Sequence, residues 1–366
     1  MSLRVLVAGG TGLFGQTIVQ ELLNSTLAIE VAIAARHLPR GLLPSVANGK
    51  PVEFITLNLH DLASLQHALI GRDVLVLAAG PFQNLSPEIA RVAAESGVHY
   101  IDLCDDPVYF SAVTALSAVW QGTARVCLTG LSSLPGISLP LATLLQEKFD
   151  RIDDIDIGLF IGNANRKGRG AVFSSLKALG QLVPVWREGT LTSRPGGTEA
   201  VDFPYPNPIG KVKSTLIASP DASAFVRFGP IKNLSARVGF EWALARAAFS
   251  FFRILAMAGA PALVRWLVNL MFPFFSLMHS FGTQRGSVTV LMRGEKNGQP
   301  CTWRASLVGE AHGQKMASLP AVIACEALAK SEIVGEGVRP LNEWLPPREF
   351  LSRLEKHGFT LSLEKL

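Results

Sequence analysis

A glycine-rich turn near the N-terminus constrains the fold of this chain more than any other feature. The apolar run Leu3–Ala8 predicts a buried β-strand, and a helical pattern runs from Gly12 to Leu23. Between them, backbone N–H groups and the positive end of a helix dipole would face a pyrophosphate. We assign Gly10 to the tight turn, Gly12 to the phosphate approach and Gly15 to helix–strand packing. The predicted cofactor-binding residues of this turn are Gly9, Thr11, Gly12, Leu13, Phe14 and Gly15.

Strands and helices alternate over the first 145 residues. The further predicted strands are Glu30–Ala35, Val52–Leu57, Asp73–Ala78, His99–Leu103 and Arg125–Thr129. The helices between them are predicted after the N-cap Asp61, over Ser86–Ser96 and over Tyr109–Trp120. Continuous apolar strands separated by helices indicate a parallel sheet covered on both faces. The predicted fold class is therefore α/β, with a doubly wound Rossmann domain that binds NAD(P) in residues 1–145.

The end of the second predicted strand distinguishes between the two nicotinamide cofactors. A site for NAD usually carries Asp or Glu there, on the ribose 2′-hydroxyl. This chain has Arg36 and His37 instead, with Arg40 close by. A guanidinium at that point would bind a 2′-phosphate and stack on adenine. We therefore expect NADP rather than NAD; the alternative is an Arg36 that only faces solvent.

Small residues follow the fourth predicted strand, at an edge where ligands bind in open α/β sheets. Ala79 and Gly80 would let the cofactor lie against the backbone, and Pro81 and Phe82 would shape the nicotinamide pocket. The alternative is a loop built only from turn residues.

The fifth predicted strand ends in a polar cluster that supplies the candidate catalytic residues Asp102, Cys104 and Asp105. Either aspartate would act as a general base or orient a substrate amine, and the thiol would donate weakly to a substrate. Each has a structural alternative. Asp105 and Asp106 suit the cap of a helix that begins at Pro107, and Cys104 suits the core.

The residues that several other kinds of site would need are absent from the sequence. Four widely spaced cysteines without a CxxC pair exclude a disulfide scaffold and a zinc ribbon. No HExxH motif or histidine cluster indicates a metal, and no Gly-x-Ser-x-Gly elbow indicates a hydrolase. Short-chain dehydrogenases need Tyr-x-x-x-Lys, but Tyr100, Tyr109 and Tyr205 are not followed by such a lysine. Leu3–Ala8 is too short for a signal peptide, so we expect a cytoplasmic protein.

The second half is predicted to form another α/β domain over residues 146–312. Asp154–Ile161 alternates as a strand, and Ser287–Arg293 and Cys301–Val308 form a hairpin around Gly294–Gly298. Asn163–Gly170 reads as a basic loop, and Ser193–Pro208 as a Pro- and Gly-rich loop. Residues 1–145 carry a net charge of −3 and residues 146–366 carry +8, which together give the net +5. A polyanion partner and a domain that merely lacks acids both fit this, and we expect no nucleic-acid partner.

Residues 240–282 are unusually apolar for a chain with only 17% charged residues. The segment is rich in phenylalanine and predicts helices, but Arg253 and Arg265 interrupt it, so a spanning helix is not expected. Three interpretations stay open: peripheral contact with a membrane, a homodimer interface, or a lid over an apolar substrate.

The N-terminal third resembles the saccharopine dehydrogenase-like oxidoreductase family through Val7–Gly15, Ala78–Phe82 and Ser96–Leu103. The tail resembles the same family through Gly313–Ala317, Pro320–Ala329 and Gly335–Pro340. The resemblance implies a nicotinamide cofactor, a second α/β domain, and C-terminal helices in 313–366 that return to the Rossmann domain.

The resulting hypothesis is an NADP-dependent oxidoreductase that transfers hydride to or from an apolar, lipid-like small molecule at the interdomain cleft. One alternative is a non-catalytic NADP-binding protein with a regulatory or membrane-associated role. The other is an amino-acid reductase of the saccharopine type.

Overall fold

The computed structural model describes residues 2–37, 52–166, 181–258, 263, 266–267, 269–270, 281–339 and 343–366. The chain divides into two compact units. The first contains Met1–Ser132 and Ala317–Pro346, and the second contains Ser133–Met316 and Pro347–Leu366. Arg40 and the end of the predicted basic loop, residues 167–170, lie outside the described residues.

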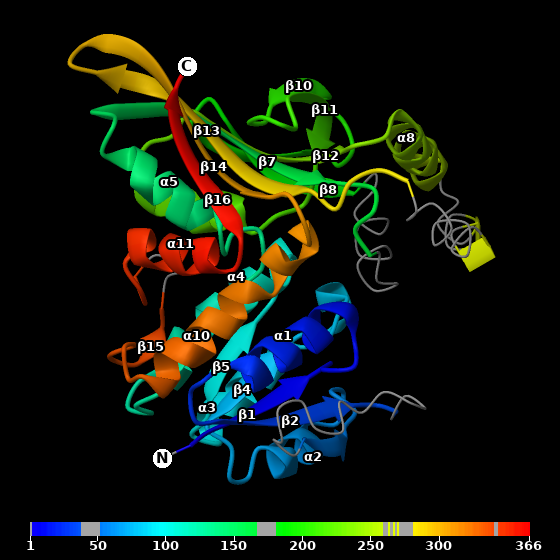
Figure 1. Ribbon diagram of the computed structural model, residues 1–366, viewed down its shortest axis with the longest axis vertical. Coiled ribbons are helices and arrows are strands. Elements are labelled where there is room, and N and C mark those ends of the chain that lie inside the picture. Colours follow the sequence, from blue (N-terminus) through cyan, green and yellow to red (C-terminus); the bar gives the residue numbers. More distant parts are fainter. Residues whose placement is uncertain are drawn as a thin grey trace. The chain divides into compact units, whose positions relative to one another are not determined.

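The first unit is built on a parallel sheet. Over the described residues it has seven strands in the order β15-β6-β5-β4-β1-β2-β3 (Figure 1). Their bounds are β1 (Leu3–Ala8), β2 (Ile29–Ala35), β3 (Glu53–Thr56), β4 (Val74–Leu77), β5 (His99–Asp102), β6 (Val126–Leu128) and β15 (Gly337–Val338). Strand β1 pairs in parallel with both β2 and β4, so the strand order reverses between β1 and β4. This is the doubly wound order of a Rossmann domain, as predicted.

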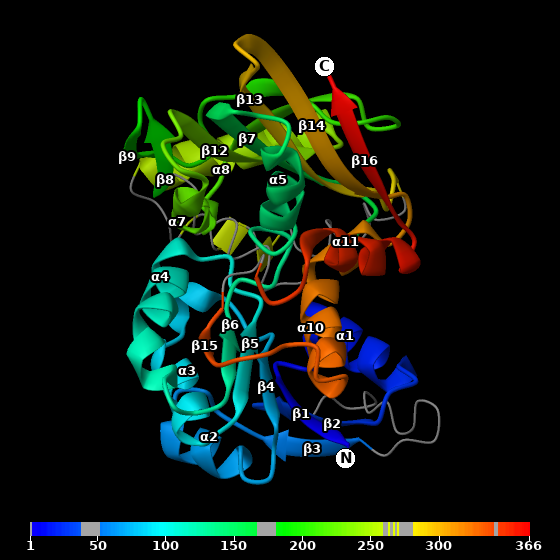
Figure 2. The same ribbon diagram turned by 90° about the vertical axis from the view of Figure 1, so that its left-hand side faces the viewer.

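Helices cover both faces of this sheet because its central strands, β1 and β4, are largely apolar and buried. Figure 2 shows α1 and α10 on one side and α2, α3 and α4 on the other. Their bounds are α1 (Leu13–Asn24), α2 (Leu62–Ala68), α3 (Glu88–Glu95), α4 (Pro107–Ala115) and α10 (Leu319–Ala329), with 3₁₀ turns η1 (Phe82–Asn84) and η2 (Leu116–Trp120). Asp61 caps α2 by accepting a hydrogen bond from the Ser64 N–H at 3.1 Å, which confirms the predicted cap.

The second unit is built on a mixed sheet. Among the described residues its main path runs β10-β11-β12-β7-β13-β14-β16, and the hairpin β8–β9 joins it at β12. The bounds are β7 (Arg151–Ile161), β8 (Leu182–Arg187), β9 (Thr190–Pro195), β10 (Val201–Pro204), β11 (Lys211–Leu216), β12 (Asn233–Phe240), β13 (Gly286–Lys296), β14 (Gln299–Gly309) and β16 (Phe359–Lys365). Its helices are α5 (Ser138–Gln146), α7 (Asp221–Ala224), α8 (Ala243–Met257) and α11 (Pro347–Lys356), with the 3₁₀ turns η3 (Phe225–Phe228) and η5 (Gly313–Ala317).

The structure of the second unit differs from the sequence-based expectations at three places. The predicted loop Ser193–Pro208 contains the end of β9 and the whole of β10, because Phe203 and Tyr205 bury themselves against Phe160. The β13–β14 hairpin turns only at Asn297 and Gly298, both at positive φ, rather than over Gly294–Gly298. Segment 313–366 is not only helical, since β16 pairs with β14 along its whole length.

The unit boundaries also differ from the expected 1–145, 146–312 and 313–366. Helix α5 belongs to the second unit, where it packs on β13 and β14. The C-terminal segment is shared, because α10 and β15 complete the first unit whereas α11 and β16 complete the second. Within the described residues, none of the helices is both long and apolar enough to cross a bilayer.

A carboxylate is completely buried in the second unit. Asp221, the first residue of α7, accepts hydrogen bonds from the hydroxyls of Ser138 and Ser219. Burial disfavours the charged form, and the two hydroxyls offset this only in part. The pKa of Asp221 is consequently raised to about 6.

This raised pKa predicts that the second unit loses stability as the pH rises. The folded state holds the Asp221 proton more tightly than the unfolded chain, so its contribution is full below the unfolded pKa and is lost as the pH rises through about 6. Asp221→Asn should therefore gain stability relative to the wild type by about 2 kcal/mol between pH 4 and pH 8. Urea unfolding at both pH values measures this. The same change at the exposed Asp202 is the control, and an equal response of both variants would contradict the prediction.

Candidate functional site

The glycine turn joins β1 to α1 at the carboxyl edge of the first sheet. Gly9 N–H donates to the Ala34 carbonyl at 2.8 Å, and Gly12 N–H donates back to the Gly9 carbonyl at 2.9 Å. The Gln16 side-chain amide closes the turn by donating to the Thr11 carbonyl at 2.9 Å. Helix α1 then begins at Leu13 with no side-chain cap. Its first N–H groups are therefore the unsatisfied donors that an anion at a helix N-terminus accepts from.

Neighbouring backbone atoms leave no space for a side chain at Gly9 and Gly15. A Cβ on Gly9 would lie 2.6 Å from the Ala79 nitrogen, and one on Gly15 would lie 2.7 Å from the Gly10 Cα. Gly9 also has the positive φ of the turn, +84°. Gly10 lies within the turn that the Gly12 N–H closes onto the Gly9 carbonyl, and a Cβ on it would lie 2.9 Å from the Ile33 side chain. The packing role predicted for Gly15 is confirmed.

The loop after β4 lies directly against this turn. Ala78 N–H donates to the Ala8 carbonyl at 2.8 Å, and the Ala79 backbone is the closest neighbour of Gly9. The structure thus brings Ala79 together with the glycine turn at the point where the strand order reverses. This is where ligands bind in doubly wound sheets.

Pro81 and Phe82 continue the same loop into η1. Phe82 is only 5% exposed, and its ring packs edge to face on Tyr109 with centroids 5.2 Å apart. Phe82 therefore belongs to the hydrophobic core of the first unit. Gly80 is exposed and Pro81 is half-buried, so these two residues are the accessible part of the loop.

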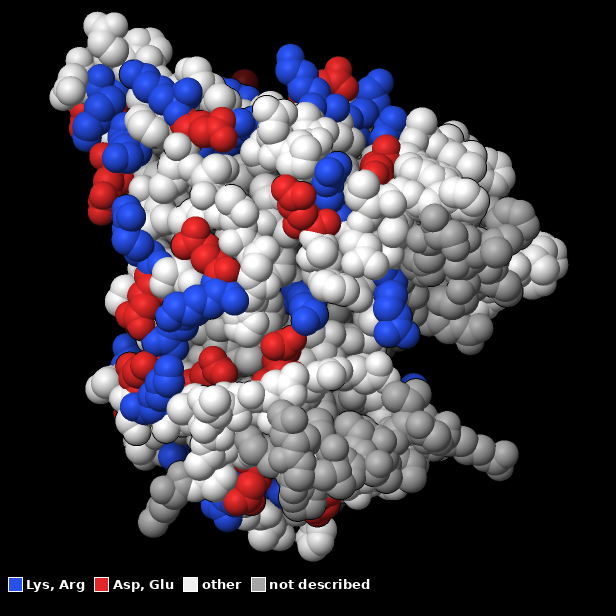
Figure 3. All heavy atoms as spheres, viewed as in Figure 1, with Lys and Arg blue, Asp and Glu red and all other residues white. Residues whose placement is uncertain are grey.

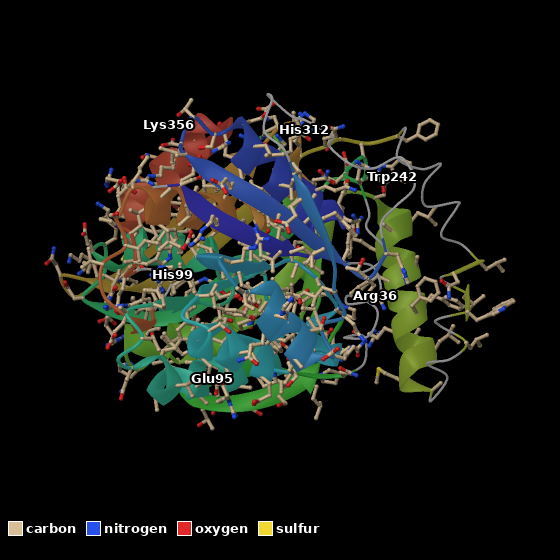
Figure 4. All side chains as sticks on the ribbon, turned by 90° about the horizontal axis from the view of Figure 1, so that it is seen from below. Arg36, Glu95, His99, Trp242, His312 and Lys356 are labelled. Carbon is tan, nitrogen blue, oxygen red and sulfur yellow. The ribbon has the colours of Figure 1, made fainter. Side chains whose placement is uncertain are left out.

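Arg36 and His37 follow β2 and are both exposed (Figure 4). The Ala34 carbonyl of the same strand bonds the Gly9 N–H, so the end of β2 is fixed to the glycine turn two residues before Arg36. The guanidinium makes no ion pair with the residues that the structure describes. It is therefore available to an anionic group at this edge of the sheet.

Asp102 is a buried tie between two loops. Its Oδ1 accepts hydrogen bonds from the N–H groups of Gly130 (2.7 Å) and Cys104 (3.0 Å). Its Oδ2 accepts from the Thr129 hydroxyl at 2.8 Å. Burial raises the pKa of Asp102, and these donors act against the shift. With a side chain that has no exposed surface, Asp102 holds the ends of β5 and β6 together rather than meeting a substrate.

The other two candidate catalytic residues differ in access. The Cys104 thiol is buried and donates to the Asp106 carbonyl at 3.2 Å. Burial and the nearby Asp102 raise the pKa of this thiol far above its usual range, so it stays protonated. Asp106 caps α4 by accepting from the Tyr109 N–H at 2.8 Å. Of the three candidates, only Asp105 is exposed.

Sequence reasoning missed three residues at this edge. Thr129 and Gly130 donate to Asp102, and Ser318 donates its hydroxyl to the Phe14 carbonyl at 3.2 Å. The hydrogen bond from Ser318 to Phe14 connects the start of α10 to the start of α1, although the two residues are 304 positions apart in the sequence. Thr129 and Gly130 end the sixth strand, a position that could have indicated them, whereas nothing local marks Ser318.

The glycine turn fits the pyrophosphate of a dinucleotide. A Cβ added to Gly12 would have only the Gly9 carbonyl oxygen, at 3.2 Å, near it among the described atoms. Gly12 is exposed, so a ligand can reach the backbone there. The uncapped N–H groups of α1 supply donors, and Arg36 supplies a cation at the expected distance along the chain.

Residues 5–126 match the family of saccharopine dehydrogenase NADP-binding domains. This part of the chain, about a third of its length, is thus similar to a domain of that family. The match lies within the first unit and confirms the prediction of a Rossmann domain that binds NADP. Comparison with curated proteins yields no match.

Solved structures share the fold of this chain along its whole length. Saccharopine dehydrogenase (L-Glu forming) from Saccharomyces cerevisiae is 13% identical with a TM-score of 0.69, and the alignment covers 100% of both chains. Homospermidine synthase from Legionella pneumophila, in complex with NAD, is 11% identical with a TM-score of 0.66, covering 100% of this chain and 91% of that one. At such identities the likeness concerns the fold.

Two glycine variants separate the ligand role of the turn from its packing role. Gly12→Ala should fold normally but weaken NADPH binding roughly tenfold or more, because its methyl group occupies the approach of the phosphate. Gly15→Ala should instead destabilise the protein by about 1–3 kcal/mol, because rigid backbone occupies the space of its Cβ. Fluorescence titration with NADPH and thermal unfolding measure the two effects. Normal NADPH binding by the folded Gly12→Ala variant would contradict the assignment.

Proposed function

We propose that this protein is an NADP-dependent oxidoreductase that acts on an apolar small molecule. The observation that carries the proposal is the glycine turn at the β1/β4 reversal, with Arg36 at the end of the neighbouring strand. The domain-family match and the likeness to a dehydrogenase of the same fold support it. When bound, NADPH supplies the hydride.

The chain's own residues have separate tasks in this proposal. The N–H groups at the start of α1 hold the pyrophosphate, and Arg36 holds the 2′-phosphate. Asp102 keeps the loops after β5 and β6 in place. Asp105, exposed three residues beyond β5, is the remaining candidate to exchange a proton with the substrate or to orient it.

The apolar nature of the substrate is inferred from residues 240–282. Such a concentration of phenylalanine is unusual outside a core, and large apolar side chains in this segment are exposed, among them Phe251 and Trp266. An apolar substrate or a second subunit of a homodimer would each give these side chains a partner.

The burial of Asp102 and Cys104 favours a second candidate, a non-catalytic protein that binds NADP for regulation. Two of the three predicted catalytic residues are inaccessible to a substrate. The assay that separates the candidates follows NADPH oxidation with panels of enoyl, carbonyl and imine compounds, including amino-acid-derived imines. Turnover of apolar members supports the proposal. Turnover of amino-acid imines alone supports a reductase of the saccharopine type, and no turnover supports the regulatory role.

Replacing Arg36 should alter the choice of cofactor. Arg36→Gln is expected to weaken NADPH binding by roughly 10- to 100-fold, because a charge-assisted pair with the 2′-phosphate is lost. NADH binding should remain unchanged, since NADH lacks this phosphate. Calorimetric titration of both cofactors measures the effect, with the partly exposed Arg91 on α3, changed to Gln, as control. If the wild type binds NADH as tightly as NADPH, Arg36 does not have this role.

Asp105 and Cys104 give opposite expectations for turnover. Asp105→Asn should lower kcat by roughly 10²–10⁴-fold without changing the dissociation constant of NADPH, as expected for loss of acid–base catalysis. Cys104→Ser should leave kcat close to that of the wild type, because the buried thiol stays protonated. A pH profile of kcat for the wild type and both variants tests this. A larger loss in Cys104→Ser than in Asp105→Asn would reverse the assignment.

A further inference from the structure

One carboxylate holds the two ends of the apolar segment 242–282 together. Glu241 follows β12, and its Oε2 accepts hydrogen bonds from the N–H groups of Asn163 (2.7 Å) and Thr283 (2.9 Å). The Asn163 side-chain amide donates to the Phe281 carbonyl at 2.8 Å. The two ends of the segment therefore meet at a single point of the second unit. Figure 4 shows Trp242 at this point, where α8 begins.

Helix α8 presents apolar side chains to solvent. Leu244, Phe251, Ile254 and Met257 are 64%, 53%, 58% and 56% exposed, and Ala247 between them is exposed as well. Steps of three or four residues place these positions on one face of the helix. A helix on the surface of a domain normally turns its polar residues toward water, so the pattern of α8 is reversed.

The charged residues of α8 do not interrupt this face. Arg246 and Arg253 are both partly buried, and Arg246 Nη1 donates to the Phe240 carbonyl at 2.8 Å. The surface at α8 that is turned to the viewer in Figure 3 is correspondingly white. Other described residues of the segment are also exposed and apolar, namely Leu263, Trp266, Leu270 and Phe281.

The charged residues near α8 indicate which kind of partner its apolar face would bind. No Asp or Glu occurs between Glu241 and Glu295, whereas Arg246, Arg253, Arg265 and Arg285 do. Arg293, in β13, is already paired with Asp156. In a two-fold dimer this face would meet itself, and like charges would approach without acids from the segment to pair with them. An anionic bilayer supplies acyl chains for the apolar face and phosphates for the guanidinium groups.

We propose that the exposed face of α8 docks this protein on the surface of an anionic phospholipid bilayer. The helix lies in the interface with Leu244, Phe251 and Ile254 among the acyl chains, and arginines of the segment contact the headgroups. None of the described helices spans a bilayer, which agrees with binding at the surface. The proposal is independent of the oxidoreductase activity, because vesicle binding is measured without NADPH turnover.

Co-sedimentation of the full chain with vesicles tests the proposal. The wild type should sediment with vesicles of phosphatidylcholine and phosphatidylglycerol, and much less with phosphatidylcholine alone. The double variant Phe251→Ser/Ile254→Ser should bind the mixed vesicles roughly tenfold or more weakly, because two apolar side chains no longer enter the interface.

The matched control is Val108→Ser/Leu182→Ser, which removes two apolar side chains elsewhere that are even more exposed, at 76% and 69%. It should bind vesicles like the wild type. Thermal unfolding and NADPH titration establish that both variants are folded. Failure of the wild type to bind mixed vesicles, or equal binding to neutral ones, overturns the proposal. So does a mass by light scattering that falls from dimer to monomer in the α8 variant without any vesicle binding.

Discussion

The contact between the start of α1 and the backbone of the glycine turn sets the geometry of the whole carboxyl edge of the first sheet. Without Cβ atoms on Gly9 and Gly15, three pieces of backbone meet at distances that no other residue pair allows. The end of β2 and the loop after β4 are hydrogen-bonded to the same few residues. The donors for a phosphate, the cation at Arg36 and the loop at Gly80 therefore share one rigid frame. A small displacement of α1 would shift all of them together.

The buried carboxylate of Asp102 connects a second pair of strands, β5 and β6. Asp102 converts the ends of β5 and β6 into one unit through three short hydrogen bonds. A carboxylate is costly to bury, and it is tolerated here because each oxygen has a donor. The polar residue that looks most catalytic in the sequence is thus the one with least access to a ligand, whereas its exposed neighbour Asp105 is open to chemistry.

Sequence patterns predicted the first unit well because its signals are local. The bounds of β1 and the cap at Asp61 follow from the apolar period and from hydrogen bonding within one turn. The lack of space for a Cβ at Gly9 and Gly10 comes from Ala79 and Ile33, which are distant in sequence, and no local pattern reveals these contacts. Pairing of β10 with β11 and of β16 with β14 is likewise nonlocal, so polar or Pro-rich strands were taken for loops or helices. The burial of Phe82 was hidden for the same reason, since its ring packs on Tyr109 of α4.

The division of the C-terminal segment has a consequence for biosynthesis. Strand β15 pairs with β6, and α10 packs on α1, but both are made after nearly all of the second unit has left the ribosome. Until then β6 presents an unpaired edge, and the face beneath α10 is exposed. Such edges and faces are where nascent chains associate wrongly. The second unit waits in the same way for α11 and β16, so both units stay incomplete until the C-terminal segment has been made.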